Sequence, residues 1–286
     1  MDQSVRTPAV AGSFYGTDPG MLKYQLNQIR IPEAVADIHG CMVPHAGYVF
    51  SMPTALRTLA AARENNYSRA VIIGPSHRCA FNGICLASYS EWATPFGTME
   101  LDREGFEYLS SSVSENLCVD NAPHIQEHSI EVELPLLHHL FGKIKIIPVL
   151  AGQLDYRIAD GIGKILSKLD TPDTLWVISG DFTHYGKSFG YTPFGIPVEQ
   201  EKLNALDREA AEYIAKCDLA GLAAFLNRTH ATICGVNPAA LYLRMLAHSG
   251  TSVTGNITAV TDSGRVSKDL SHVVGYAGIT FRKVEK

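Results

Sequence analysis

Short apolar runs alternate along this chain with longer amphipathic stretches. The apolar runs predict strands at residues 38–43, 69–74, 84–87, 143–150 and 174–179. Helical spacing between them predicts helices at residues 52–64, 102–111, 129–140, 155–169, 199–216, 219–226 and 237–248. Residues 253–261 and 273–281 predict two final strands that pair antiparallel. This alternation predicts an α/β fold with a mostly parallel central sheet and helices on both faces.

Capping residues and prolines set the expected helix boundaries. Ser51 is the expected N-cap of the helix at 52–64, with Pro53 in its first turn. Asp155 caps the helix that reaches residue 169, and Pro135 interrupts the helix at 129–140. No stretch rich in Pro, Gly or Ser is long enough to separate domains. We therefore interpret residues 1–286 as one domain.

Composition narrows the classes of function. The 286 residues are 46% hydrophobic and carry a net charge of −5 without a Lys/Arg cluster, which argues against nucleic-acid binding. The first eight residues lack the basic and apolar regions of a signal peptide, and no apolar run approaches the ~20 residues that a membrane span needs. The six cysteines form no CxxC pair, so we expect reduced thiols in a cytoplasmic protein.

Histidines follow three of the predicted strands. His45 and His77 each lie just after a proline that ends a strand, and His184 follows the strand at 174–179. Ligands in an open α/β sheet bind beyond the carboxyl ends of the strands, so these positions predict a metal site or an acid–base site. The alternative for each histidine is a hydrogen bond to a loop carbonyl.

Two further residues have chemistry suited to the same edge. Asp181 lies three residues before His184, where a carboxylate can set the tautomer of an imidazole; the alternative is an N-cap. Cys234 precedes the helix that opens at Asn237, where the helix dipole favours a thiolate. The alternative for Cys234 is a buried, inert thiol.

Residues 124–128 read His-Ile-Gln-Glu-His and match the inverted zinc-protease motif. On one helix face, His124 and His128 could bind one zinc ion, with Glu127 as general base. Pro123 and the polar residues before it place the segment at or before a helix start, which leaves that face uncertain. The chain contains no Walker loop and no G-x-S-x-G elbow.

Taken together, these segments resemble the Memo family, of the AmmeMemoRadiSam system protein B type, which is related to class III extradiol ring-cleaving dioxygenases. The resemblance covers nearly the whole chain. It runs through Ala11-Gly12-Ser13-Phe14-Tyr15, Val43-Pro44-His45-Ala46-Gly47-Tyr48, Gly74-Pro75-Ser76-His77, Glu127-His128-Ser129-Ile130-Glu131, Ser179-Gly180-Asp181-Phe182-Thr183-His184 and Ile233-Cys234-Gly235.

The resemblance implies an extradiol-dioxygenase-like fold with a metal pocket at the sheet edge. His45, His77 and Cys234 would be the ligands of Fe(II), with Cu or Zn as alternatives. His184 and Asp181 would flank the open side as catalytic residues. Glu127 and His128 would contact the ligand side chains instead of the metal. This role competes with the zinc-protease interpretation of the same two residues. The related dioxygenases have a carboxylate where this chain has Cys234. That thiol is softer and oxidisable, so ring cleavage of catechols does not carry over.

Three functions stay open at this point. The first is a metal-dependent oxidoreductase in which His184 moves a proton. The second is a hydrolase or transferase, metal-free or zinc-assisted, with Cys234 as nucleophile, His184 as base and Asp181 orienting it. The third is a binding or adaptor protein that takes a small-molecule or peptide ligand. The resemblance also implies a pathway link to an AMMECR-type protein and a radical-SAM enzyme, and the chain's size leaves a homo-oligomer open.

Overall fold

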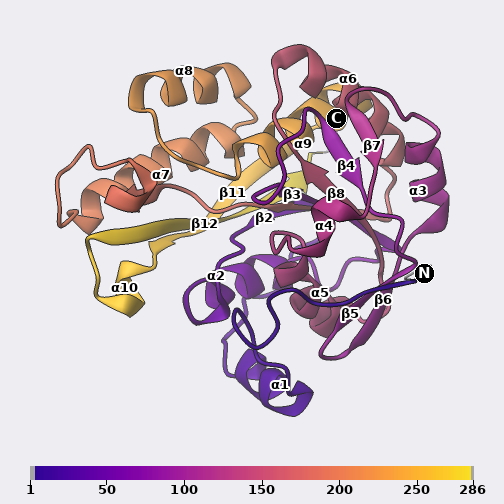
Figure 1. Cartoon of the computed structure of the whole chain (residues 1–286), viewed down its shortest axis with the longest axis horizontal. Helices are drawn as coiled ribbons and strands as arrows, with labels where there is room; N and C mark the ends of the chain where they lie inside the picture. The colour runs from indigo at the N-terminus through magenta and orange to yellow at the C-terminus, as the bar shows by residue number, and fades with distance from the viewer. Residues whose placement is uncertain (1–3, 285–286) are drawn as a thin grey trace.

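The computed structural model, which describes residues 4–284, has a mixed sheet at its centre (Figure 1). Its middle strands are parallel and lie in the order β2 (Ile38–Val43), β9 (Thr174–Ser179), β3 (Arg69–Pro75) and β8 (Lys145–Ala151). Antiparallel strands flank them: β12 (His272–Lys283) pairs with β2, and β4 (Ile84–Leu86) pairs with β8. Beyond these lie β7 (Leu117–Val119), β10 (His184–Gly186) and β11 (Val253–Asp262).

Helices cover both faces of this sheet, which confirms the predicted α/β class (Figure 1). Alternate residues of β3 point to opposite cores: Val71 and Ile73 join one, Ala70 and Ile72 the other. The first core is closed by α3 (Arg103–Ser110), α6 (Tyr156–Leu166), α7 (Gln200–Ala215), α8 (Leu219–Thr229) and α9 (Val236–Ser249). The second is closed by α1 (Pro19–Asn27), α2 (Tyr48–Ala60) and α5 (Leu134–Phe141).

The predicted start of α2 is wrong by one turn. The helix begins at Tyr48, with Gly47 rather than Ser51 as its N-cap. Ser51 lies inside the first turn, where its hydroxyl donates to the carbonyl of Ala46 at 2.7 Å. Pro53 consequently lies in the helix interior. The prediction relied on Ser51 and Pro53 because Ser and Pro commonly start helices. In the structure, the loop after β2 ends at Gly47, before these residues, and the helix begins there.

The predicted helix at 129–140 is also corrected. Residues Glu131–Glu133 form a 3-10 turn, and α5 begins after it with Pro135 in its first turn. Pro135 therefore lies in the first turn of α5 and does not interrupt a longer helix. Proline is tolerated there because the backbone N–H that it lacks would have no acceptor within the helix.

A smaller sheet was not predicted. It consists of β1 (Val5–Arg6), β5 (Glu91–Thr94) and β6 (Gly97–Glu100). These strands are short and half-exposed, so their apolar pattern is weak. Two short helices, α4 (Ala122–Ile125) and α10 (Gly264–Ser267), complete the elements named here.

The described residues bear on the expectations about membrane spans and about the two ends of the chain. Within residues 4–284, no helix combines the length and the apolar character that crossing a membrane requires. Residues 1–3 lie outside the described residues; they begin the segment that we interpret as lacking a signal peptide. Residues 285–286, the end of the expected domain at 1–286, also lie outside them.

Candidate metal centre

The loops that follow the parallel strands converge at one edge of the sheet. His45 follows β2, His77 follows β3, and Asp181 follows β9. Because β2, β9 and β3 are parallel neighbours, their carboxyl ends open at the same edge. The segment before α9 brings Cys234 to this edge, since Thr183 bridges to Ile233.

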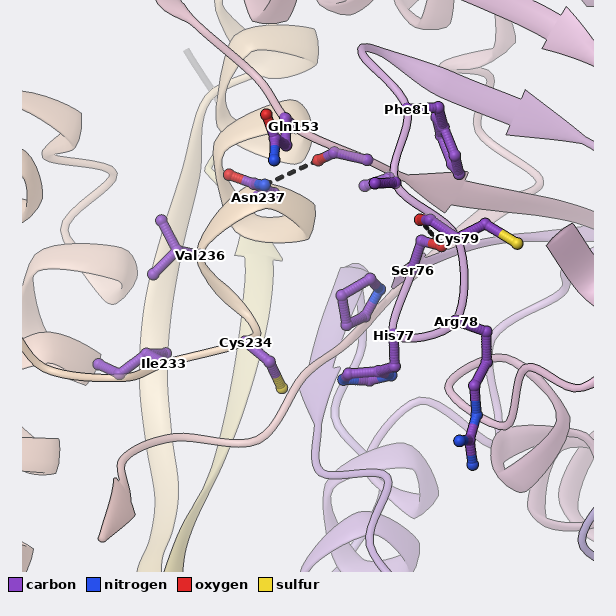
Figure 2. A pocket seen from close by; sticks show the side chains of 14 residues that line it. Ser76, His77, Arg78, Cys79, Phe81, Gln153, Ile233, Cys234, Val236 and Asn237 are labelled. Carbon is purple, nitrogen blue, oxygen red and sulfur yellow. Dashed lines mark hydrogen bonds between the residues drawn. The ribbon is translucent and has the colours of Figure 1, made fainter. Parts of the chain in front are cut away.

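His45, His77 and Cys234 form a set that could hold a metal ion. One potential ligand atom from each lies within 4.8 Å of those of the other two. The Cys234 Sγ atom is 3.4 Å from Nε2 of His45, and the two imidazole rings are 5.1 Å apart. Figure 2 shows the side chains of Cys234 and His77 pointing toward one another. Two imidazoles and a thiol suit Fe, Zn or Cu ions.

A hydrogen bond at Nδ1, the ring nitrogen that does not face Cys234, holds the side chain of His45. Its Nδ1 lies 2.9 Å from the Ser179 hydroxyl, which donates its own proton to the carbonyl of Ser129 at 2.5 Å. The hydroxyl oxygen can therefore accept a hydrogen bond from Nδ1–H. The tautomer that follows leaves the lone pair of Nε2 directed toward Cys234. Burial, together with the neighbouring histidines, holds the pKa of His45 well below its usual range, so the ring is neutral.

Glu127 holds His77 in the equivalent way. Its Oε1 is 3.0 Å from Nδ1 of His77, and its Oε2 accepts the His77 backbone N–H at 2.6 Å. The same carboxylate also accepts the backbone N–H groups of His128 and Ser129. Burial raises the pKa of Glu127, but the hydrogen bonds from His77 and Ser129 help to outweigh it, and the pKa falls to about 2. The ionised carboxylate thus binds Nδ1–H and leaves Nε2 of His77 free.

His128 and His184 complete a cluster of imidazoles around this edge. The ring of His128 stacks on His77 at 4.8 Å and lies edge-on to His45 at 5.4 Å. The Nε2 atom of His184 is buried and has no hydrogen-bond partner among the described residues. Burial and the neighbouring histidines lower the pKa of both His128 and His184 to about 4. Both rings are therefore neutral near pH 7.

Asp181 faces His45 instead of His184. Its Oδ1 accepts the backbone N–H of His45 at 2.9 Å, and its Oδ2 lies 4.0 Å from Nε2 of the same residue. The expectation that Asp181 orients His184 is thus wrong, and it caps no helix, because β10 follows it. Burial raises the pKa of Asp181 to about 7, although the backbone N–H of His45 opposes the shift.

In the protein without a metal ion, the surroundings of Cys234 favour the neutral thiol over the expected thiolate. Burial and the nearby Asp181 carboxyl raise the pKa of this thiol well above its usual value. The helix N-terminus that follows Cys234 does not compensate for these two effects. A metal cation in contact with the sulfur would reverse the balance, since a coordinating thiol is deprotonated.

His124 takes no part in the candidate centre. It lies in the short helix α4, which ends at Ile125, so His124 and His128 do not share a helix face. Its Nε2 contacts the carbonyl of Cys85 at 3.2 Å, and its ring packs on Trp92. The inverted zinc-protease interpretation of residues 124–128 is therefore wrong.

A buried ion pair supports Glu127, and the sequence pattern did not indicate it. Arg6 and Glu131 are 2% and 1% exposed and form an ion pair at 2.7 Å. Arg6 also donates to the carbonyls of His124 and Glu127, at 2.8 and 2.6 Å. The N-terminal segment thus holds the backbone on which Glu127 lies. More than a hundred residues separate Arg6 from its partners, and no local signal marks such a contact.

Asp207 of α7 supports the strand that carries His184. Its Oδ1 accepts from the backbone N–H and the hydroxyl of Thr183, while its Oδ2 is buried without a hydrogen-bond partner among the described residues. Burial raises the pKa of Asp207 from 3.8 to about 7, and the carboxyl of Asp262 adds to the effect.

This raised pKa makes stability depend on pH. The folded chain binds more protons at Asp207 than the unfolded chain between about pH 4 and pH 7, so this group's contribution falls as pH rises through that window. Asp207→Asn removes the titration. Its free energy of unfolding relative to the wild type should therefore increase with pH, by at most ~1.4 kcal/mol per unit, and level off above about pH 7. Urea unfolding of both proteins across this pH range measures the difference in their free energies of unfolding. A difference that stays constant with pH would contradict the prediction.

A cavity of about 470 Å³ opens beside His77 and Cys234 (Figure 2). We call it the metal-end cavity; its polar lining includes Ser76, Arg78 and Gln153. Asn237 at the start of α9 also lines it and donates to the carbonyl of Gly152 at 2.8 Å. The metal-end cavity gives a small molecule access to His77 and Cys234.

The family model and the related sequences agree on a family. The family model described as Memo-like protein matches residues 6–280. A MEMO1 family protein of Thermococcus onnurineus is 33% identical over 98% of this chain and 100% of its own length, and one of Methanopyrus kandleri is 33% identical over 97% and 99%. A solved structure of an uncharacterized Escherichia coli K12 protein, at 10% identity, has a TM-score of 0.49 over 85% of this chain and 99% of that chain. The chain belongs to the Memo family.

Proposed function

We propose that this protein is a metal-dependent redox enzyme whose Fe(II) ion is held by His45, His77 and Cys234. Cu is the alternative redox metal, whereas Zn at the same site has no redox chemistry and would support hydrolysis instead. The observation that carries the proposal is the convergence of these three donors within 4.8 Å beside the metal-end cavity. The bound metal would supply open coordination positions for oxygen or substrate, as at other non-haem sites with few protein ligands.

The chain's own residues have separate tasks in this proposal. Ser179 and Glu127 hold the Nδ1 atoms of His45 and His77, so that both Nε2 atoms stay available. His184 is neutral near pH 7 and has an unpaired Nε2, where it could accept a proton from a bound substrate. Asp181 holds the loop of His45 in place through the backbone N–H of that residue.

The test is the metal content of tag-free protein purified without oxygen, measured by mass spectrometry of the elements. We expect close to one iron or copper ion per chain in the wild type and its loss in His45→Ala and Cys234→Ser. Cys79→Ser is the matched control, because Cys79 also lines the metal-end cavity but is not one of the proposed ligands. Zinc lost in both variants would favour hydrolysis, and wild-type protein without metal would overturn the proposal.

Burial is unfavourable to the hydrolase or transferase alternative, in which Cys234 is the nucleophile. A Cys234 nucleophile would need a thiolate, and burial raises the pKa of that thiol well above its usual value. The binding or adaptor function, the cytoplasmic location, the homo-oligomer and the link to an AMMECR-type protein and a radical-SAM enzyme stay predictions from the sequence.

A further inference from the structure

An apolar groove of about 370 Å³ runs between α6, α8 and α9. Its walls are formed by Ala159, Leu222, Ala223, Leu226 and Ala240. The proposed ligands and their supporting residues make no use of this groove.

The charged side chains in the wall of the groove are already engaged. Asp155 caps α6 by accepting the backbone N–H of Ile158 at 2.7 Å. The guanidinium of Arg244 lies over the ring of Tyr156, 4.2 Å from its centre. The groove therefore presents mainly hydrocarbon, and no unengaged charge in its wall selects a polar ligand.

The groove and the metal-end cavity adjoin. Val236 and Asn237, in the first turn of α9, line both spaces. The adjacent residues Gln153 and Leu154 continue the boundary, because Gln153 lines the cavity and Leu154 lines the groove. Figure 2 shows Cys234, Val236 and Asn237 together at the start of α9. The cavity and the groove therefore meet along the first turn of α9.

Building on the proposed function, we infer that the substrate is a single-chain amphiphile. Its polar head lies against His77 and Cys234 in the metal-end cavity, and its hydrocarbon tail lies in the apolar groove. The polar lining of the cavity suits a head group that can bind a metal, whereas the groove suits only the tail. Each buried methylene contributes about 0.8 kcal/mol, which is about fourfold in the dissociation constant.

The test uses acetohydroxamate, octanohydroxamate and decanohydroxamate, whose heads bind metals and whose tails differ in length. Their dissociation constants are measured by calorimetry on the metal-loaded protein, below the concentrations at which the long chains form micelles. We expect decanohydroxamate to bind at least tenfold more tightly than acetohydroxamate in the wild type. Ala223→Glu places a charge in the groove and should abolish this gain while leaving the affinity for acetohydroxamate unchanged.

Ala224→Glu is the matched control, because Ala224 is an exposed alanine on the same helix that does not line the groove. It should keep the full gain with tail length. Equal affinity for all three probes in the wild type would overturn the inference alone. A metal-loaded protein that fails to bind acetohydroxamate, or a protein without metal, would overturn the proposed function and the inference with it. A wild-type dimer that Ala223→Glu converts to a monomer in sedimentation would assign the groove to a second copy of the chain and overturn the inference.

Discussion

Replacing Glu131 with Gln is expected to lower the free energy of unfolding by about 3–5 kcal/mol, as typically follows when one partner of a buried ion pair is removed. Glu131 is 1% exposed and pairs with Arg6, which is 2% exposed. It also accepts the backbone N–H groups of Ala9 and Val10, at 2.7 and 2.9 Å, and the hydroxyl of Tyr15 at 2.9 Å. A neutral amide would leave the Arg6 charge buried without a counter-ion and turn N–H groups toward these donors.

Chemical denaturation followed by circular dichroism measures this effect. The control is Lys202→Ala, which removes a solvent-exposed ion pair with Glu199 on α7 and should change stability by less than about 1 kcal/mol. A similar small change for Glu131→Gln would contradict the role assigned to the buried pair. Because Arg6 also donates to the carbonyl of Glu127, a folded Glu131→Gln protein should in addition bind metal more weakly than the wild type.

Replacing Glu127 with Gln is expected to weaken metal binding by about 10- to 100-fold, the usual effect of removing the partner that orients a metal-binding histidine. The carboxylate accepts from both the ring Nδ1 and the backbone N–H of His77. An amide offers one acceptor oxygen, and its NH₂ group would face one of these donors. The ring of His77 would then lose the hydrogen bond that keeps Nε2 directed at the candidate centre.

Competition with a chelator of known affinity measures the change in metal binding. Glu107→Gln, an exposed substitution on α3, is the control and should leave the affinity unchanged. Near-ultraviolet circular dichroism must show that the Glu127→Gln protein retains its tertiary structure. A folded variant that binds metal as tightly as the wild type would mean that Glu127 has no part in orienting His77.

Most strands and helices could be predicted from the chain because their signals are local. The runs that form β2, β3, β8 and β9 are apolar enough to be buried on both faces, which is typical of strands in the middle of a parallel sheet. The Asp155 cap of α6 and the antiparallel pairing of β11 with β12 were likewise predicted. Boundaries were less reliable: α2 starts a turn before Ser51, because the path of the loop decides where the helix begins.

The sequence by itself determined the α/β class and the places of His45, His77 and His184 after strands, because a strand followed by Pro or a short polar turn is a local pattern. The tertiary structure decided the rest. In the fold, Asp181 contacts the backbone of His45, and burial raises the pKa of the Cys234 thiol. Arg6 donates to the backbone carbonyl of Glu127. These features depend on which distant segments share a buried space, and hydrogen bonding and desolvation there follow three-dimensional neighbours, not spacing along the chain.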